Sequence, residues 1–519
     1  MTVNLPLLIL LIPAAATAVL FLVPARNGAL VKRISFVATL AVLVLAGILA
    51  ATFPTTDAPT EAAGAHVFKH VISIPWIPAL GLQLKLGVDG IGVAMVLLTA
   101  LTIFTGVCVS FRVQDRPKEF FLNLLALVTG VFGVFLSLDL FFYYFFYELA
   151  VIPMFLLIGC WGSTTKTMSR DYASMKLVLM LTTGAVFMLI GLLAVYVKAH
   201  TFDMVVIERL AQEGLFSRGF QMGWFPAIFL GFAVLVPMWP LHSWSPGGHA
   251  AAPAAVSMLH AGVLMKLGAY GILRIACTYL PDAAAAYLPW VAILCCFNIV
   301  YGGLVAVAQR DMKFVVGYSS SSHMGYVLLG IATANVIGVQ GAVFLMFAHG
   351  IMTALAFSLI GFFYDQTHTR MLDDLGGLMK RMPFIGTMFV VMSMASAGLP
   401  GFANFVSELL VIIGAWHQGM YVPAILAAWG IVITGVYLLR TIKDAFLGEM
   451  PARWEGLKDA ATPFDRMPFV LLAAVLLVFG FWPKPLLGWI EQGVNPIVSG
   501  LEAARERAAA PAGVERGAR

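Results

Sequence analysis

The sequence predicts an all-α polytopic membrane protein with about 14 transmembrane helices. Its 519 residues are 61% hydrophobic and only 11% charged, with a mean hydropathy of +0.93, whereas a soluble domain has about 25% charged residues. Apolar runs of roughly 20 residues, the length that crosses a bilayer, recur along the chain. The lipid bilayer is therefore the expected environment, and the formal charge of +5 is expected to set topology rather than to bind nucleic acid.

The expected transmembrane helices are separated by short polar or turn-rich segments. They cover residues 5–24, 31–53, 88–111, 118–137, 140–161, 173–197, 223–245, 254–278, 286–308, 314–333, 339–363, 383–416, 421–446 and 467–490. In the first of them, Pro6, Pro13 and the lack of an early basic region favour a retained helix over a cleaved signal peptide.

The connecting segments predict the topology. Loops such as 112–118 and 440–466 make one side richer in Lys and Arg than the other, and basic loops stay on the inner side of a membrane. An even number of helices then places both termini on the outer side. There, the alternation of LQLKL in the loop 54–87 predicts a short hairpin. The chain after Leu501 is expected to be an Ala/Arg/Glu helix or to be disordered.

Helix breakers interrupt two of the expected helices at mid-membrane depth. The first break is VPMWPLHSWSPGG, from Val236 to Gly248, and the second is AGLPGFANF, from Ala397 to Phe405. Proline removes a backbone donor and clashes with the preceding turn, and paired discontinuous helices are typical of inverted-repeat transporters. We therefore expect two inverted five-helix repeats, each with a discontinuous helix. They cover residues 118–278 and 286–446, flanked by 1–117 with the first three helices and by 447–519 with the last helix and polar tail.

Glu148, Lys266 and Glu408 are charged residues that lie inside apolar stretches of these helices. A charge at the bilayer centre costs roughly 2.5–3.5 kcal/mol on insertion scales, so such residues usually mark an ion or proton path. Each residue also has a purely structural alternative. Lys266 could snorkel toward the end of its helix, Glu148 could be a neutral acid, and Glu408 could form a hydrogen bond between helices. Charge transfer through the membrane is the leading hypothesis.

Several intramembrane histidines are candidate relay groups, because the imidazole pKa is near 6.5 and the ring has two nitrogens. They are His242, His249, His260, His323, which follows four serines, and His349. Each could equally be a simple hydrogen-bonding group between helices. His260 and Lys266 are six residues apart, about 9 Å along a helix, and are not expected to touch.

The sequence gives weaker indications of function for the other polar residues and for the cysteines. Asp311 and Lys313, at a helix start, are expected to be solvated or interfacial. The five cysteines have no C-x-x-C spacing and no His/Cys cluster has zinc-ligand spacing. Neither a disulfide framework nor a metal site is expected.

Six stretches, in order, resemble a known family. They are DLFFYYFFYELAVIPMFLLIGCWG (139–162), PMWPLHSW (237–244), AGVLMKLGAYGILR (261–274), QRDMKFVVGYSSSSHMGYVLLGI (309–331), FAHGIMTALAFSLIGFFYDQTHTR (347–370) and GLPGFANFVSELLVIIGAW (398–416). The family is the antiporter-like chain M of bacterial NADH:quinone oxidoreductase (respiratory complex I), the counterpart of mitochondrial subunit 4.

The resemblance implies a proton-translocating subunit of the membrane arm, which couples quinone reduction to proton pumping without redox chemistry in this chain. The chain itself would hold no cofactor, and the parent complex would carry FMN, iron-sulfur clusters and quinone. The implied partners are the antiporter-like chains L and N and the small chains K, J, A and H. The implied location is the bacterial inner membrane, with both termini on the periplasmic side.

The resemblance also implies roles for individual residues. Glu148, Lys266 and Glu408 match the charged residues of the fifth, eighth and twelfth helices, and Glu408 would hand protons to the outer side. His323 and His349 match the histidines of the tenth and eleventh helices, and Lys176 matches a sixth-helix lysine.

The chain departs from the family pattern at two positions. Leu235 replaces the lysine that partners the fifth-helix glutamate, which leaves Lys176 and His242 as candidate cations, and Gly247 replaces an aspartate. Conversely, His260 matches the sister chain L and multi-subunit sodium/proton antiporters. Alternatives therefore stay open: a subunit of such an antiporter or of a membrane-bound hydrogenase, or a non-pumping structural subunit of the membrane arm.

Overall fold

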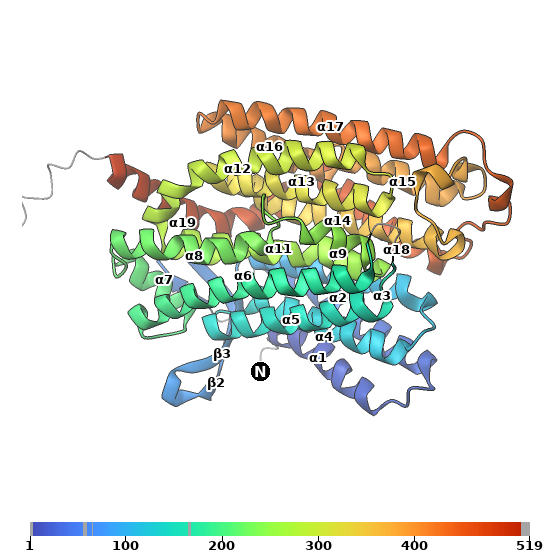
Figure 1. Ribbon diagram of the computed structural model, residues 1–519. Helices are drawn as coiled ribbons and strands as arrows, with labels where there is room; N and C mark the ends of the chain where they lie inside the picture. The colour runs from blue at the N-terminus through green and yellow to red at the C-terminus, as the bar shows by residue number, and fades with distance from the viewer. Residues whose placement is uncertain (1–3, 55–59, 65, 165–167, 510–519) are drawn as a thin grey trace, which may run out of the picture.

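The computed structural model describes residues 4–54, 60–64, 66–164 and 168–509; the tail beyond Ala509 lies outside this range. Long helices with nearly aligned axes form one bundle (Figure 1). The helices are α1 Leu5–Leu22, α2 Gly28–Thr52, α3 Gly90–Val109, α4 Pro117–Leu136, α5 Leu140–Trp161, α6 Arg170–Ala199, α7 Met204–Gln212, α8 Arg218–Leu235, α9 Trp244–Ala251, α10 Ala254–Leu259, α11 Met265–Gly271, α12 Pro281–Ala308, α13 Met312–Thr333, α14 Val336–Thr367, α15 Pro383–Ser396, α16 Ala403–His417, α17 Tyr421–Phe446, α18 Pro463–Phe481 and α19 Lys484–Ala509.

The predicted helical membrane fold is confirmed. In the described part of the chain, 11 helices are long and apolar enough to cross a membrane. The other three expected spans, 223–245, 314–333 and 383–416, fall on α8 with α9, on α13, and on α15 with α16. The last expected span, 467–490, is wrong at its end, because α18 stops at Phe481 and a new helix begins at Lys484.

The predicted hairpin is confirmed and belongs to a small antiparallel sheet. Strands β2 (His66–Ile77) and β3 (Leu82–Val88) pair with Ser73 opposite Lys85, and β1 (Thr60–Ala63) adds a third strand to β2. Bridges from Leu86 to Ser137 and from Asp139 to Asp203 attach the turns of neighbouring helices to this region. We call this end of the bundle the sheet end and the opposite end the loop end.

The last helix closes the sheet end. After Leu501 the chain is helical as far as Ala509, so the helical alternative is confirmed for this part. The Arg505 guanidinium donates to the carbonyl of Thr333 at 3.1 Å, and Arg507 pairs with Asp282 at 2.7 Å. Helix α19 thereby holds together the sheet-end termini of several bundle helices.

Both predicted helix breaks are present. Between α8 and α9, the Asn298 side chain accepts from the Trp239 amide at 2.5 Å and donates to the Pro237 carbonyl at 3.0 Å. Between α15 and α16, Gly398 and Gly401 have φ of 64° and 99°, which glycine adopts without steric penalty. At the first break a polar side chain thus takes over hydrogen bonds that the helix has lost, and at the second break glycines let the backbone leave the helix.

The helix that carries Lys266 contains a feature that the sequence pattern did not predict. Two π-helical segments, η3 (His260–Leu264) and η4 (Ile272–Cys277), flank α11. Such π-turns are rare and occur often at functional sites.

We expect Gly130→Ala on α4 to lower stability by about 1–3 kcal/mol, the usual effect of overpacking. A Cβ there would lie 2.7 Å from the Phe146 carbonyl oxygen and 2.8 Å from the Ala150 nitrogen, both on α5. Thermal unfolding of the purified protein in detergent measures the effect. Gly435→Ala on α17 is the matched control, because nothing lies within 4 Å of its Cβ position. Equal melting temperatures for the two variants would contradict this packing argument.

Candidate functional site

The structure brings four of the sequence-predicted residues into one continuous polar chain. Lys266 Nζ lies 2.8 Å from His349 Nδ1, and the rings of His349 and His323 have centroids 4.9 Å apart. His323 Nε2 lies 3.4 Å from Glu408 Oε1. All four side chains are buried. They come from α11, α14, α13 and α16, so the chain joins one half of the sequence to the other.

Lys266 has a local partner that the sequence did not predict. Its ammonium group donates to the carbonyl of Ala261, which lies in the π-helical segment η3. Together with His349, this carbonyl satisfies a side chain that is fully buried. The structural alternative, a lysine that snorkels toward the end of its helix, therefore does not apply to Lys266.

His349 connects the lysine to a hydroxyl group. When Lys266 is protonated, its ammonium group can only donate, so Nδ1 of His349 then accepts from it. The proton of a neutral His349 ring is then on Nε2, which lies 3.1 Å from Ser320 Oγ. The ring can therefore receive a proton on one side and release one on the other.

His323 and Glu408 share a polar contact beside the second helix break. His323 Nδ1 donates to the carbonyl of Ser319 at 2.8 Å, which leaves Nε2 to face the Glu408 carboxyl group. Glu408 packs against the break, since a Cβ on Gly398 would lie 2.6 Å from its Oε2. One proton can be held between this imidazole and this carboxyl group.

Only part of the serine run faces these histidines. Ser319 and Ser320 do so, whereas Ser321 and Ser322 donate to backbone carbonyls. Tyr437 on α17 donates to Ser319 Oγ at 2.7 Å. Sequence reasoning missed Tyr437, because a tyrosine in an apolar helix carries no local signal of a polar neighbour.

A second group of histidines lies at the first break. The rings of His249 and His260 have centroids 3.9 Å apart, and His249 Nε2 lies 3.1 Å from Ser245 Oγ. Among the described residues, neither ring nitrogen of His260 has a hydrogen-bond partner. Gly248 allows this approach, because a Cβ there would lie 2.9 Å from His260 Cε1. His260 therefore contacts His249, and no hydrogen bond joins it to Lys266 in the described structure.

Asp311 and Lys313 are buried, so the expectation that they are solvated is wrong, whereas an interfacial depth stays a prediction. Asp311 pairs with Arg370 at 2.7 Å, and Lys313 Nζ donates to the Ala252 carbonyl at 2.5 Å. Lys313 lines a cavity of about 540 Å³ at the loop end, together with Ser163 and Asp365. This cavity reaches the carbonyl that follows α9.

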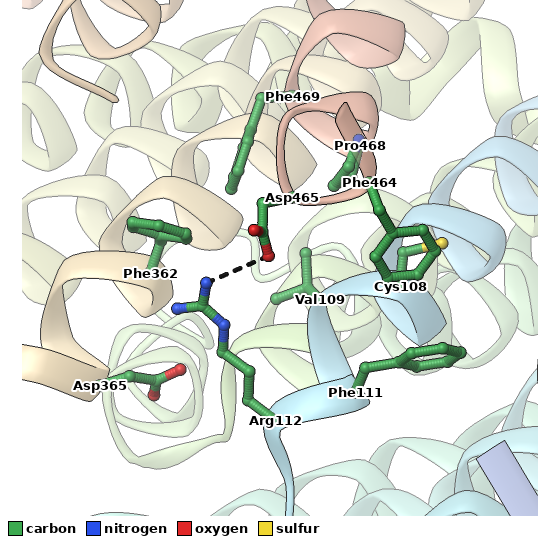
Figure 2. A pocket seen from close by; sticks show the side chains of 10 residues that line it. All are labelled: Cys108, Val109, Phe111, Arg112, Phe362, Asp365, Phe464, Asp465, Pro468 and Phe469. Atoms are coloured by element: carbon green, nitrogen blue, oxygen red, sulfur yellow. Dashed lines mark hydrogen bonds and ion pairs between the residues drawn. The ribbon is translucent and has the colours of Figure 1, made fainter. Parts of the chain in front are cut away.

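A smaller cavity of about 50 Å³ adjoins it (Figure 2). Arg112 Nη2 lies 3.4 Å from Asp465 Oδ1, and its guanidinium lies 4.2 Å from the Phe362 ring centre. Arg112 and Asp365 line both cavities. Charged groups of both signs therefore surround the polar opening at the loop end.

The structure leaves Glu148 outside the polar chain. Its carboxyl group on α5 is half-buried and has no ion-pair partner within 4 Å among the described residues, so neither Lys176 nor His242 supplies the missing cation. Leu235 is buried on α8. At Gly247 a Cβ would lie 2.8 Å from Met168 Sδ, and thus apolar packing occupies the place of the lost aspartate.

Comparisons with known proteins identify the family of this chain. Residues 137–434 match the family described as NADH:quinone oxidoreductase/Mrp antiporter, TM. NADH-quinone oxidoreductase subunit M of Rhodobacter capsulatus is 36% identical over 515 residues, which cover 96% of this chain and 97% of that protein.

Solved structures share the fold over nearly the whole length. A chain of respiratory complex I from Thermus thermophilus superposes with a TM-score of 0.82 at 27% identity, covering 96% of this chain and 99% of that chain. A chain of the Mrp complex from Dietzia sp. DQ12-45-1b also gives a TM-score of 0.82, at 20% identity, covering 97% of this chain and 99% of that chain; this match concerns the fold alone. The chain therefore belongs to the subunit M family of NADH-quinone oxidoreductases, within the wider NADH:quinone oxidoreductase/Mrp antiporter family.

Proposed function

We propose that this chain translocates protons in the membrane arm of an NADH:quinone oxidoreductase, through Lys266, His349, His323 and Glu408. The unbroken series of contacts from Lys266 to Glu408 carries the proposal. Every member can gain and lose a proton, and neighbouring groups are close enough for transfer directly or through one water. A purely structural hydrogen-bond network would not need four ionisable groups in a row.

Proton uptake is proposed from the loop end. The cavity beside Lys313 is the water-accessible opening, and Lys313 reaches the Ala252 carbonyl, which follows α9. His249 and His260 then lie between the first break and Lys266. The free nitrogens of His260 favour water in this passage, because buried polar groups rarely lack a hydrogen-bond partner.

The proposed orientation follows the charge distribution of the loops. The loop end carries the basic segments 112–118 and 440–466 and would face the inner side of a bacterial inner membrane. The sheet end, where α1 begins and α19 lies, would face the periplasm. The two breaks, in α8–α9 and α15–α16, support the assignment of inverted repeats to residues 118–278 and 286–446.

The redox steps would occur elsewhere in the complex. Glu148, Lys266 and the histidines are acid–base groups, which suits a chain that moves protons while other subunits hold FMN, iron-sulfur clusters and quinone. The proposed neighbours are chains L and N and the small chains K, J, A and H. The apolar side chains exposed on α5 and α6, such as Ile152 and Leu179, offer area for lipid or subunit contacts.

A non-pumping structural role is the second candidate, and Leu235 and Gly247 are the observations that favour it. They leave Glu148 without the cation that a pumping cycle of the family pattern would use. A buried or half-buried carboxylate without a cation is costly, so we propose that Glu148 is protonated or is paired by another subunit. Lys176 and His242 are assigned only auxiliary proton-transfer roles on this basis.

We expect Lys266→Ala to lower the number of protons moved per electron in the reconstituted complex. A positioned proton-transfer group usually contributes about 10² to 10⁴ in rate, and the alanine leaves His349 without its donor. Proton release into the liposome, measured alongside NADH oxidation, reports the ratio. Lys198→Ala, at an exposed lysine of the same protein, is the control. An unchanged ratio for Lys266→Ala would support the structural role instead.

We expect Leu235→Lys to restore a cation for Glu148 and to shift the pH dependence of turnover. An unpaired lysine at this depth costs roughly 2.5–3.5 kcal/mol, so the variant should assemble well only if Glu148 neutralises it. Turnover between acid and alkaline pH and the yield of assembled complex are the measurements. Leu235→Met, a volume-conserving change, is the matched control. If the two variants have the same pH profile, Glu148 does not respond to a cation at this position.

A further inference from the structure

A surface groove lies between α1 and α2, apart from the polar chain and from the cavities at the loop end. It has a volume of about 430 Å³, and among the described residues that line it Arg33 alone carries a charge. The other lining residues are Ile12 on α1 and Ile34, Val37, Ala38 and Ala41 on α2. Since α1 lies at the edge of the bundle (Figure 1), the groove is open to the surroundings of the protein.

The helical repeat of α2 explains the shape of the groove. Arg33, Val37 and Ala41 follow one another at intervals of four residues, so they lie in one row along the helix. Ala38, beside this row, is almost fully buried, whereas Val37 is exposed. Because the side chains of both alanines are only methyl groups, the floor of the groove stays low between larger apolar neighbours.

The groove runs from the loop end toward the middle of the membrane. Arg33 and Ala41 lie five and thirteen residues after the start of α2, which is about 8 Å and about 20 Å along the helix. Ile12 lies ten residues before the end of α1, about 15 Å from the same end of the bundle. The hydrocarbon core is about 30 Å thick. The row from Arg33 to Ala41 therefore has nearly the length of an acyl chain in one leaflet.

Basic residues surround the end of the groove at which Arg33 lies. Lys32 Nζ donates to the Phe111 carbonyl at 2.7 Å, and Lys118 Nζ donates to the Phe21 carbonyl at 3.0 Å. These two bonds hold the segments before α2 and before α4 together. The basic residues of this region, which we call the basic rim, are Arg26, Lys32, Arg33, Arg116 and Lys118.

The positive charge of the basic rim is not neutralised within the chain. None of its residues forms an ion pair with another residue that the structure describes, whereas the nearby Arg112 pairs with Asp465. Asp115 and Glu119 lie in the same stretch of sequence, but neither forms an ion pair with the rim. Unpaired positive charge beside an apolar groove matches a molecule with a negative head group and an apolar chain.

We propose that the groove between α1 and α2 binds an acyl chain of an anionic phospholipid, whose phosphate group pairs with Arg33 at the basic rim. A guanidinium can bind a phosphate through two parallel hydrogen bonds, and the long arginine side chain can reach the head-group region from within the membrane. In the proposed orientation this lipid belongs to the inner leaflet. The inference goes beyond the proposed function, because the lipid takes no part in proton transfer.

The charges favour an anionic lipid over two other occupants. The ammonium group of a zwitterionic head group would face the same unpaired positive charges. A helix of another subunit would need an acidic side chain at membrane depth to pair with Arg33, and such a side chain is costly there. A lipid phosphate lies at this depth in any bilayer.

The test uses photoreactive phospholipids that carry a diazirine in one acyl chain. The complex that contains this chain is reconstituted into phosphatidylcholine vesicles with a small share of photoreactive phosphatidylglycerol, or of phosphatidylcholine with the same photoreactive chain. After illumination, mass spectrometry locates the labelled residues. We expect phosphatidylglycerol to label residues 33–41 more strongly than phosphatidylcholine does.

Substitution of Arg33 tests the role of its charge. We expect Arg33→Gln to lower the preference for phosphatidylglycerol about fivefold, which corresponds to the roughly 1 kcal/mol that one basic residue contributes beside anionic lipid. Arg33→Lys keeps the charge and should retain most of the preference. Arg381→Gln is the matched control, because Arg381 is exposed in the loop before α15 and does not line the groove.

Substitution of Ala41 tests the groove itself. We expect Ala41→Phe to lower the labelling of residues 33–41 by both lipids, because the larger side chain fills the floor of the groove. Val44→Phe is the matched control, since Val44 is exposed on the same helix but does not line the groove.

The outcomes are independent of proton translocation. Equal labelling by the two lipids, or an unchanged preference in Arg33→Gln, would reject an anionic lipid at this site. Absence of label from residues 33–41 with both lipids would show that another molecule covers the groove and would also reject the proposal. Each of these results would leave the proposed proton path standing, and a normal proton ratio for Lys266→Ala would leave the lipid site standing.

Discussion

The full burial of the Lys266 amino group is the constraint on which the rest of the site depends. A charge inside the membrane needs polar partners that the lipid cannot supply, and here they are a backbone carbonyl and an imidazole. The carbonyl of Ala261 belongs to a π-turn, and the imidazole of His349 comes from the other half of the chain. The irregular backbone and the contact between the two halves of the chain therefore both stabilise the Lys266 side chain.

The two helix breaks provide polar surroundings for further ionisable groups on either side of Lys266. Backbone that leaves the helix at membrane depth is tolerated only where protein or water satisfies it. At the first break Asn298 does so, and the space beside it holds His249 and His260. At the second break, glycines with positive φ let Glu408 approach Gly398. The breaks thus create the places in which ionisable groups can be kept.

The buried polar contacts are of two chemical kinds, those of a guanidinium and those of an imidazole. The pair of Asp311 with Arg370 contains a guanidinium, which stays charged in proteins, so this contact fastens the loop end to α13. The contacts of His349 and His323 contain an imidazole, whose protonation can change. The fixed pairs hold the helices in register while the imidazole contacts can exchange protons.

The sequence by itself determined the membrane fold, the two helix breaks, the hairpin and the family, because hydrophobic run length, proline position and local motifs are properties of neighbouring residues. It also identified Lys266, His323, His349 and Glu408 individually. Tertiary structure alone decided that these four meet, that Asp311 and Lys313 are buried, that Glu148 has no ion-pair partner among the residues that the structure describes, and that His66 joins Glu208. Those contacts join residues up to 142 positions apart, and they depend on how helices and a sheet pack, which no local pattern encodes.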